Sequence, residues 1–319
     1  MDSHWGLKAL RVAMPYIRAY KGATFVIKLG GNLCRAGQTL DGLIDQIAVL
    51  YHLGIRVVVV HGGGPQATEL ARRLGLTPQM VAGRRITNAE MLEVAKMTFA
   101  GTVNAELLAA FRKAKVPAVG LSGIDAELVT VHRRPVQSVS DPSTGRTQEV
   151  DFGFVGDIEQ VEPGILWHLL SGGFVPVICS LAADETGQIF NINADTLAVA
   201  IAVALGAVKY FSMSTVDGIL DDINDPRTLY SYMDITEAES LMQSGKVSGG
   251  MLPKLAACLD ALRAGVPRAH IVNGERPDAL LQEIFTNEGC GTLIVVERNR
   301  AGDPAVEADA QAADVAEKP

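Results

Sequence analysis

The stretch Phe25-Val-Ile-Lys-Leu-Gly-Gly31 and its counterpart Val57-Val-Val-Val-His-Gly-Gly-Gly-Pro-Gln66 decide the fold. Each is a strand of buried type that runs directly into a glycine-rich loop and then a predicted helix. Glycines at a strand end let the backbone approach an oxyanion closely, and a helix N-terminus presents unpaired N–H groups and a partial positive charge. Ligands of open α/β sheets bind at the carboxyl ends of the strands. We therefore expect the two loops to lie side by side and to hold a polyphosphate, with Lys28 as a cation beside it.

Neither loop matches a common nucleotide-binding fingerprint. The run His61-Gly-Gly-Gly64 lacks the Lys-Ser or Lys-Thr pair of a P-loop, and no Gly-x-Gly-x-x-Gly opens the first helix. Glycine after a buried strand also makes ordinary tight turns. Two such loops in succession, one of them with a lysine, favour phosphate binding over that alternative.

The composition is that of a globular protein. Its 319 residues, 48% of them hydrophobic, suit one large or two modest domains with a well-filled core. The longest apolar run, Leu197–Val208, is broken by Gly206 and is shorter than the roughly 20 residues that span a bilayer. No basic and then apolar leader opens the chain, so we expect a cytoplasmic protein without a membrane partner. The cysteines lack C-x-x-C spacing, which argues against a zinc site and a disulfide framework. They are Cys34, Cys179, Cys258 and Cys290.

The net charge of −8 is unevenly distributed along the chain. Residues 301–319 contain five acidic residues and one lysine, so this segment carries half of the net negative charge. It has almost no large apolar side chain, and we expect residues 298–319 to form a disordered acidic tail. An acidic chain without a clustered basic stripe is not typical of nucleic-acid-binding proteins, so no nucleic-acid partner is expected.

Predicted strands and helices alternate along most of the chain. This alternation indicates an α/β fold, a three-layer αβα sandwich with a mainly parallel central sheet. The predicted strands are Thr24–Leu29, Arg56–Val60, Ala118–Leu121, Val175–Ile178, Val208–Met213 and Arg268–Val272. The predicted helices are Asp41–Leu53, Pro65–Leu74, Asn88–Phe99, Thr102–Ala114, Thr196–Leu205, Ile235–Ser244 and Pro253–Ala264. Between them, Leu128–Phe154 has the alternation and turn residues of a β-hairpin, which we interpret as a flap over a small-molecule site.

An amphipathic helix is predicted before the first strand. Apolar residues recur there at helical spacing, and Pro15 predicts a bend. The apolar positions are Leu7, Leu10, Met14 and Ile17. This stripe either packs on its own domain or pairs with the same helix of another subunit.

Two further segments carry polar residues beside a predicted helix start. In Phe190-Asn-Ile-Asn-Ala-Asp195, Asp195 has the position of an N-cap, and the two asparagines share one strand face beside it. In Val247-Ser-Gly-Gly-Met-Leu-Pro-Lys254, Lys254 falls in the first helical turn, where its charge opposes the helix dipole. A lysine at such a position indicates a bound anion.

Taken in order, five motifs resemble those of the amino acid kinase family: Lys-Leu-Gly-Gly, His-Gly-Gly-Gly-Pro-Gln, Gly-x-Arg-x-Thr, Asn-x-Asn-Ala-Asp and Gly-Gly-Met-x-Pro-Lys. The resemblance covers roughly residues 16–296 and is strongest to members that phosphorylate N-acetyl-L-glutamate. It implies the family fold, with an oligomerisation helix over residues 1–20. An N-lobe over 21–195 would hold the acyl-amino acid and the phosphate loops, and a C-lobe over 196–297 would bind ATP. The chain is also similar to the arginine-inhibited hexameric members in its bent N-terminal helix and in the segments His270-Ile-Val-Asn-Gly274 and Asn287-Glu-Gly-Cys-Gly-Thr292.

The resemblance also implies a role for each matching residue. Catalytic roles fall to Lys28 and Lys254, as cations flanking the transferred phosphoryl group, and to Asp195, which would orient both lysines. Arg85 and Asn191 would hold the carboxylates and the amide of the substrate. Backbone N–H groups would come from Gly30 and Gly31 of the phosphate-binding loop and from Gly62 and Gly63 of the substrate-binding loop. Phosphoryl transfer requires mainly in-line positioning and positive charge, and a carboxylate nucleophile is already ionised near neutral pH, so no general base is expected.

On the nucleotide side, the family's usual aspartate is replaced by Thr215, and Asp217 lies two positions later on what would be the same strand face. Arg84 stands where a leucine is usual. The full nucleotide-binding set that the resemblance implies is Ser214, Thr215, Asp217, Gly249 and Gly250. ATP and Mg²⁺ are the implied cofactors, with the metal held mainly by nucleotide oxygens and not by a dedicated set of protein ligands.

The resemblance therefore implies transfer of the γ-phosphoryl group of ATP to the side-chain carboxylate of N-acetyl-L-glutamate in arginine biosynthesis. Arginine would be a feedback inhibitor bound near His270, Glu288 and Gly289. The chain would be a homo-oligomer, either a dimer or a hexamer, and a PII-type regulator is a further partner that some relatives have.

Two alternatives stay open. One is a kinase of another acylated or carrier-bound glutamate or aminoadipate, and the other is a catalytically weak arginine sensor. Aspartokinase lacks support because no long regulatory extension follows the motifs. Carbamate and uridylate kinases do not need the Arg85/Asn191 pair.

Overall fold

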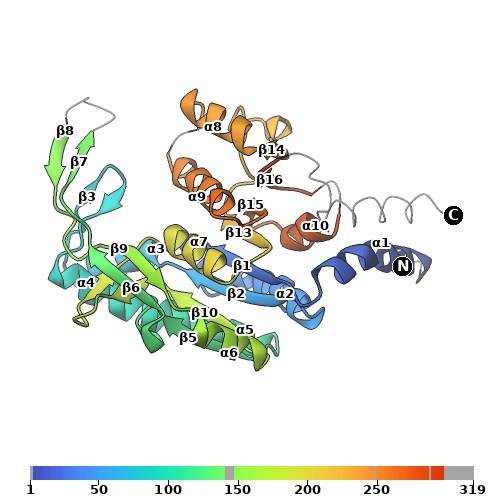
Figure 1. The fold of residues 1–319 in the computed structure, drawn as a ribbon, viewed down its shortest axis with the longest axis horizontal. Helices are drawn as coiled ribbons and strands as arrows, with labels where there is room; N and C mark the ends of the chain where they lie inside the picture. The colour runs from blue at the N-terminus through green and yellow to red at the C-terminus, as the bar shows by residue number, and fades with distance from the viewer. Residues whose placement is uncertain (1–2, 141–146, 248, 287–288, 298–319) are drawn as a thin grey trace.

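The computed structural model describes residues 3–140, 147–247, 249–286 and 289–297. Within them, an eight-stranded sheet crosses the molecule with helices on both faces (Figure 1). Its strand order is β14-β16-β15-β13-β1-β2-β10-β5, and neighbouring strands are parallel except for β15 and β16. The predicted α/β sandwich with a mainly parallel sheet is confirmed.

The predicted strands and helices are present, with their ends shifted by a few residues. The strands of the large sheet are β1 (Thr24–Leu29), β2 (Arg56–His61), β5 (Ala118–Ser122), β10 (Val175–Cys179), β13 (Lys209–Ser214), β14 (Tyr232–Asp234), β15 (Arg268–Asn273) and β16 (Thr292–Val295). The α-helices are α1 (Ser3–Tyr20), α2 (Gln38–His52), α3 (Gly64–Arg73), α4 (Ala89–Lys96), α5 (Asn104–Lys113), α6 (Gly164–Ser171), α7 (Ala194–Ala204), α8 (Ile235–Gln243), α9 (Met251–Arg263) and α10 (Ala279–Phe285). The sequence analysis missed the short elements α6, α10, β14 and β16.

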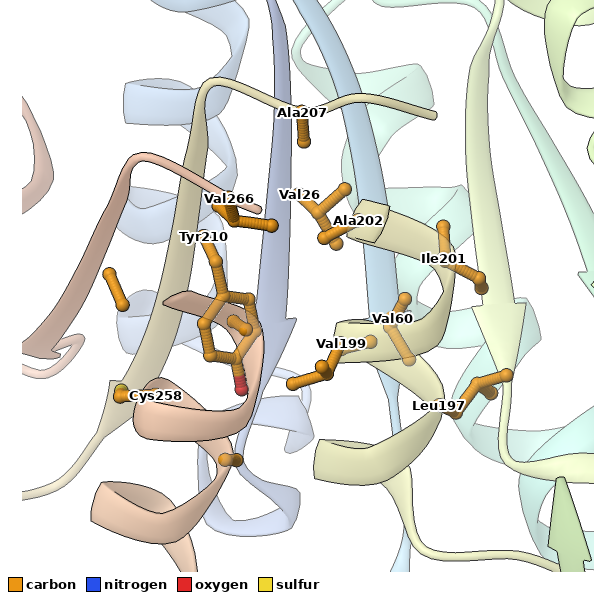
Figure 2. Packing of buried hydrophobic residues seen from close by; sticks show 14 of the residues in the cluster. Val26, Val60, Leu197, Val199, Ile201, Ala202, Ala207, Tyr210, Cys258 and Val266 are labelled. Carbon is orange, nitrogen blue, oxygen red and sulfur yellow. The ribbon is translucent and has the colours of Figure 1, made fainter. Parts of the chain in front are cut away.

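Side chains that alternate along the central strands build two cores, one on each face of the sheet. On β1, Phe25, Ile27 and Leu29 pack with α2, α5 and α10, whereas Val26 packs with α7 and α9. Figure 2 shows this second core, with Tyr210 of β13 between Cys258 of α9 and the side chains of α7. Lys28 follows Val26 by two residues, so it rises on the α7 face.

A second sheet of four strands, in the order β12-β11-β6-β9, lies beside the first. Its strands are β6 (Val129–Arg133), β9 (Gly156–Val161), β11 (Leu181–Ala183) and β12 (Ile189–Asn191). The predicted flap is confirmed as a hairpin of β7 (Gln137–Ser140) and β8 (Thr147–Val150), but β6 pairs with β9 and does not belong to it. A smaller hairpin, β3 (Met80–Val81) and β4 (Arg84–Arg85), projects from the same end of the molecule (Figure 1). Arg84 Nη1 donates to Gln137 Oε1 at 3.1 Å and joins the two hairpins.

Helices α4 and α5 are joined without a loop by η2 (Met97–Val103), a segment of π-helix. A π-helical turn is wider than an α-helical one and often occurs at a functional site. Phe99 within η2 and Asn104 directly after it are both buried. The segment therefore directs two side chains of one continuous helix into the interior.

The N-terminal helix is confirmed as α1, which runs through Pro15 without a break. Its last turn packs on its own domain, because Tyr16 and Tyr20 are buried and the Tyr20 ring meets Phe25 edge-on at 5.3 Å between centroids. Leu10, by contrast, is 55% exposed. The side chain of Leu7 and the predicted acidic tail, residues 298–319, lie outside the part that the structure describes. No helix in the described part is long and apolar enough to cross a bilayer.

Candidate active site

The two glycine-rich loops meet at the carboxyl ends of β1 and β2, where Leu29 pairs with His61. Gln66 Nε2 donates to Gly31 O at 2.7 Å, and a Cβ at Gly31 would lie only 2.7 Å from Pro65 Cδ. The loops therefore touch, and Gly31 has no room for a side chain. The predicted side-by-side arrangement is confirmed.

An open cleft of about 1010 Å³ lies at these strand ends. The predicted site residues that line it are Lys28, Gly31, Gly62, Gly63, Arg85, Asn191 and Asp195. Another part of the wall consists of small apolar side chains from α7 and α9, such as Ala200 and Ala257. The sequence analysis missed Ser180, which lines the cleft directly after β10, although its place at the end of a central strand was a usable signal.

A buried ion pair spans the cleft floor between β1 and α7. Lys28 Nζ lies 2.8 Å from Asp195 Oδ1, and the two side chains are 9% and 16% exposed. A charge buried to this extent needs a partner, because an unpaired one is costly to desolvate. The N-cap interpretation of Asp195 is wrong, since the Asn193 side chain caps α7 by accepting from the backbone N–H groups of Asp195 and Thr196. Asp195 is thereby left free to pair with the lysine.

Lys254 stands in the first turn of α9, and Pro253 next to it lines the cleft. Its Nζ donates to Gly250 O at 2.7 Å. Burial and the nearby charge of Lys28 lower the pKa of Lys254, against the opposing effect of Asp195. Among the described residues Asp195 forms an ion pair with Lys28 and none with Lys254. Two cations that destabilise each other indicate a place where a bound anion is favourable.

Arg85 is anchored on one side only. Its Nη2 donates to Gly64 O at 3.0 Å and to Thr68 Oγ1 at 2.7 Å, and partial burial lowers the pKa of the guanidinium. Its Nη1 is buried and has no hydrogen-bond partner among the described residues. A buried N–H group without a partner is costly, and a carboxylate oxygen is an acceptor that would satisfy it.

Asn191 ends β12, and its Nδ2 donates to Thr87 Oγ1 at 3.2 Å. Thr87 belongs to the Gly-x-Arg-x-Thr motif that also contains Arg85. Asn191 and Arg85 therefore come from segments far apart in sequence and line the same cleft.

The predicted nucleotide residues lie at the end of β13, in the loop that follows it and directly before α9. Strand β13 ends at Ser214, so the expectation that Thr215 and Asp217 share a strand face is wrong. Asp217 Oδ1 instead accepts from Asn273 Nδ2 at 2.8 Å. Gly30, the glycine pair Gly249 and Gly250, and Ser214, Thr215 and Asp217 do not line the cleft described above.

A second polar cluster lies among β13, β15 and α10. His270 is buried, with Nδ1 2.8 Å from Glu283 Oε1 and Nε2 3.3 Å from Lys209 Nζ. Glu283, which the sequence analysis missed, also accepts from the backbone N–H groups of Cys290 and Gly291. Gly289 is next to this cluster, because a Cβ there would lie 2.7 Å from Glu283 Oε2. Glu288 lies outside the described residues.

The amino acid kinase family model matches residues 23–273. The chain belongs to the amino acid kinase family. The acetylglutamate kinase of Myxococcus xanthus (strain DK1622) is 44% identical over 297 residues, which cover 93% of this chain and 96% of that protein. The acetylglutamate kinase of Thermosynechococcus vestitus (strain NIES-2133 / IAM M-273 / BP-1) is 42% identical over 289 residues, which cover 91% and 94%.

Two solved structures have the same fold. The N-acetylglutamate synthase of Neisseria gonorrhoeae, complexed with coenzyme A and L-arginine, superimposes with a TM-score of 0.78 at 30% identity. That match covers 91% of this chain and 65% of the synthase, so the chain spans about two thirds of the longer protein. The carbamate kinase of Giardia lamblia bound to AMP-PNP shares the fold, with a TM-score of 0.59 at 20% identity.

Two buried histidines of this amino acid kinase make its stability depend on pH. Burial lowers the pKa values of His61 and His270 from 6.5 to about 4. The unfolded chain therefore binds protons below about pH 6.5 that the folded chain binds only near pH 4, so stability is full above about 6.5 and falls with pH below it. The expected loss is up to about 1.4 kcal/mol per pH unit for each histidine.

Thermal unfolding recorded across this pH range checks the expectation. His61→Asn should flatten the pH dependence, whereas His52→Asn, a change at an exposed histidine, should leave it as it is. If the melting temperature of His61→Asn falls with pH as steeply as that of the wild-type protein, His61 is not a buried neutral histidine.

Proposed function

We propose that the chain acts as an acetylglutamate kinase, which transfers the γ-phosphoryl group of ATP to the side-chain carboxylate of N-acetyl-L-glutamate in arginine biosynthesis. The observation that carries this proposal is the buried Lys28–Asp195 pair in one cleft with Arg85, whose Nη1 has no partner among the described residues. A cation at the phosphate loops and a free guanidinium edge suit a substrate that brings both a phosphoryl group and a carboxylate. The two relatives named acetylglutamate kinase, matched over nearly their whole length, support this choice of substrate.

Substrate binding falls to Arg85 and Asn191. The free Nη1 edge of Arg85 would bind the α-carboxylate, because a planar guanidinium matches a carboxylate in two hydrogen bonds. Asn191 would bind the acetamido group, which needs one donor and one acceptor. Held at these points, the side-chain carboxylate reaches toward Lys28 and the glycine loops as the nucleophile, already ionised at neutral pH.

Phosphoryl transfer falls to the cations and backbone amides. Negative charge spread over the equatorial oxygens of the transferred group would be stabilised by Lys28 on one side and Lys254 on the other. Gly31, Gly62 and Gly63 would donate backbone N–H groups, with Gly30 shaping the first loop. Asp195 keeps the Lys28 ammonium in place, and its ion pair with Lys28 accounts for a buried carboxylate in a site for anions.

ATP and Mg²⁺ are part of the proposal. No group of three or more His, Cys, Asp or Glu side chains in the described part of the chain is arranged to hold a metal ion. Mg²⁺ would be held mainly by nucleotide oxygens and water, since Mg²⁺ keeps much of its hydration shell. When bound, the ion neutralises charge on the phosphates. The loops with Ser214, Thr215, Asp217, Gly249 and Gly250 would hold the rest of the nucleotide, in a C-lobe of residues 196–297 that faces an N-lobe of residues 21–195.

Replacing either lysine should lower kcat far more than KM. We expect Lys28→Met and Lys254→Met each to reduce kcat about 100-fold, because their charges act on the transition state. ADP release coupled to a colour reaction, with N-acetyl-L-glutamate as acceptor, measures this. Lys113→Met, a change at an exposed lysine of α5, is the matched control and should keep full activity. A double variant with normal kcat rules out the proposed mechanism.

Arg85→Lys should act on the substrate side. We expect KM for N-acetyl-L-glutamate to rise about tenfold with KM for ATP unchanged, since a point charge does not replace a two-hydrogen-bond contact. The same assay with N-acetylaminoadipate separates the glutamate kinase from a kinase of the longer acid. If only the KM for ATP changes, the assignment of Arg85 to the N-acetyl-L-glutamate site is wrong.

Regulation and assembly complete the proposal. Arginine would bind near His270, Gly289 and Glu288, a region joined to α1 because Lys209 Nζ lies 4.9 Å from the centre of the Tyr20 ring. The Neisseria gonorrhoeae synthase solved with L-arginine supports an arginine site on this fold. We further propose that the protein is a cytoplasmic homohexamer whose subunits are joined through residues 1–20. A PII-type regulator is the further partner that we propose.

Truncating α1 before its buried tyrosines tests this part. Removing residues 1–14 leaves Tyr16 and Tyr20 in the core, so the kinase should fold and keep its activity. We expect the truncated protein to be smaller in solution than the full chain and to be inhibited much less by arginine. Light scattering and arginine titrations of both proteins measure this, and an unchanged mass with unchanged inhibition excludes both roles for the helix.

A further inference from the structure

The motif His61-Gly-Gly-Gly64 contains a side chain that the proposed mechanism does not use. His61 is the last residue of β2, is fully buried and does not line the cleft. By strand alternation it points with Val57 and Val59 to the face of the sheet that α5 covers. It therefore lies below the glycine loop, on the side away from the cleft.

The contacts of His61 define a single tautomer. Its Nδ1 lies 2.8 Å from Gly62 O, and its Nε2 lies 3.2 Å from Asn104 Nδ2. A carbonyl oxygen only accepts, so Nδ1 carries the proton and donates to Gly62 O. Nε2 is then a bare acceptor, which suits the amide donor of Asn104. A neutral ring satisfies both contacts, and a proton on Nε2 would set two donors against each other.

Asn104 is itself held in place. Its Nδ2 also donates to Val177 O of β10 at 3.1 Å, so each of its two amide hydrogens has an acceptor. Gly120 of β5 provides the space, because a Cβ there would lie 2.0 Å from Asn104 Oδ1. Strands β10 and β5 therefore hold the Asn104 amide in place, and this amide in turn holds the His61 ring.

The planar peptide transmits this arrangement to the cleft. Gly62 C=O and Gly63 N–H belong to one trans peptide, in which they point in opposite directions. Since Gly62 O is held against the buried ring, Gly63 N–H faces the other way, toward the cleft that both glycines line. Among the described residues this N–H has no backbone acceptor. A Cβ at Gly63 would lie 2.6 Å from Phe99 Cδ1, so a larger residue would displace the peptide.

We propose that His61 and Asn104 are positioning residues that fix the Gly62–Gly63 peptide, with its N–H directed at the phosphoryl group during transfer. The inference rests on the proposed function for the group that the N–H meets. A donor aligned before the reaction stabilises charge in the transition state without reorganising. The contribution belongs to kcat, because the substrates are bound mainly by other groups.

Two amide variants of His61 separate the two contacts of the ring. The Asn amide in His61→Asn lies near the position of Nδ1 and can still donate to Gly62 O, whereas the Gln amide in His61→Gln reaches the position of Nε2 and loses that bond. We expect His61→Gln to lower kcat at least tenfold with both KM values within about twofold, and His61→Asn to keep most of kcat. Asn104→Leu should lie between them.

Matched measurements keep stability and catalysis apart. Gln46→Leu removes another buried amide, which accepts from Leu280 N far from the cleft lining, and should lower the melting temperature while kcat stays normal. If kcat is equal in His61→Gln and His61→Asn, or follows melting temperature across all four variants, His61 is structural only and the proposal is overturned.

The ring itself gives a readout that does not depend on activity. Nitrogen-15 NMR of labelled histidines at neutral pH should show a neutral Nδ1–H tautomer that disappears in His61→Asn. An Nε2–H tautomer or a charged ring overturns the contact with Gly62. A wild-type protein without acetylglutamate-dependent ADP release rejects the proposed function instead, and these spectra still decide the His61–Gly62 contact.

Discussion

The level carboxyl ends of three parallel strands are the constraint on which the site depends. Leu29 of β1 pairs with His61 of β2 on one side and with Met213 of β13 on the other. The loops that follow these three strands therefore begin at the same level along the strand direction. Because side chains alternate, a slip of β1 by one residue would turn Lys28 into the core below the sheet and an apolar neighbour toward Asp195. Packing on both faces forbids that slip, so the core sets the position of the Lys28 ammonium.

The same alternation places the proposed ligand-binding groups and the proposed positioning groups on opposite faces of the sheet. Lys28 rises on the α7 face and pairs with Asp195, while His61 descends on the opposite face and contacts Asn104. Both are polar groups in the interior, and each is tolerated because it has a partner. At this edge of the sheet, the Lys28–Asp195 ion pair lies on the α7 face and the neutral His61–Asn104 hydrogen bond lies on the opposite face. The glycine loop lies between them.

Sequence patterns predicted the central strands and the loops because long apolar runs that end in glycine have few alternatives. They did not resolve details that one residue decides. Asp195 and Asn193 are both good caps, and only the geometry of the helix start gives that role to Asn193. The end of β13 at Ser214 has no signal in a run of serine and threonine, so Asp217 was placed on a strand face that does not exist. Glu283 was missed because its partner His270 lies on another element and the spacing between them follows no repeat.

The π-helical turn between α4 and α5 makes the spacing within residues 89–113 a fixed quantity. Phe99 borders Gly63 from inside that turn, and Asn104 reaches His61 from directly after it. Each residue of an α-helix rotates the rest by about 100° around the axis, so an insertion or deletion in α4 or α5 would rotate the residues on its two sides relative to each other while leaving the helix helical. During sequence divergence, this segment can therefore accept substitutions but not insertions or deletions. The loops beyond the cleft are free of that restriction, and insertions and deletions should gather there.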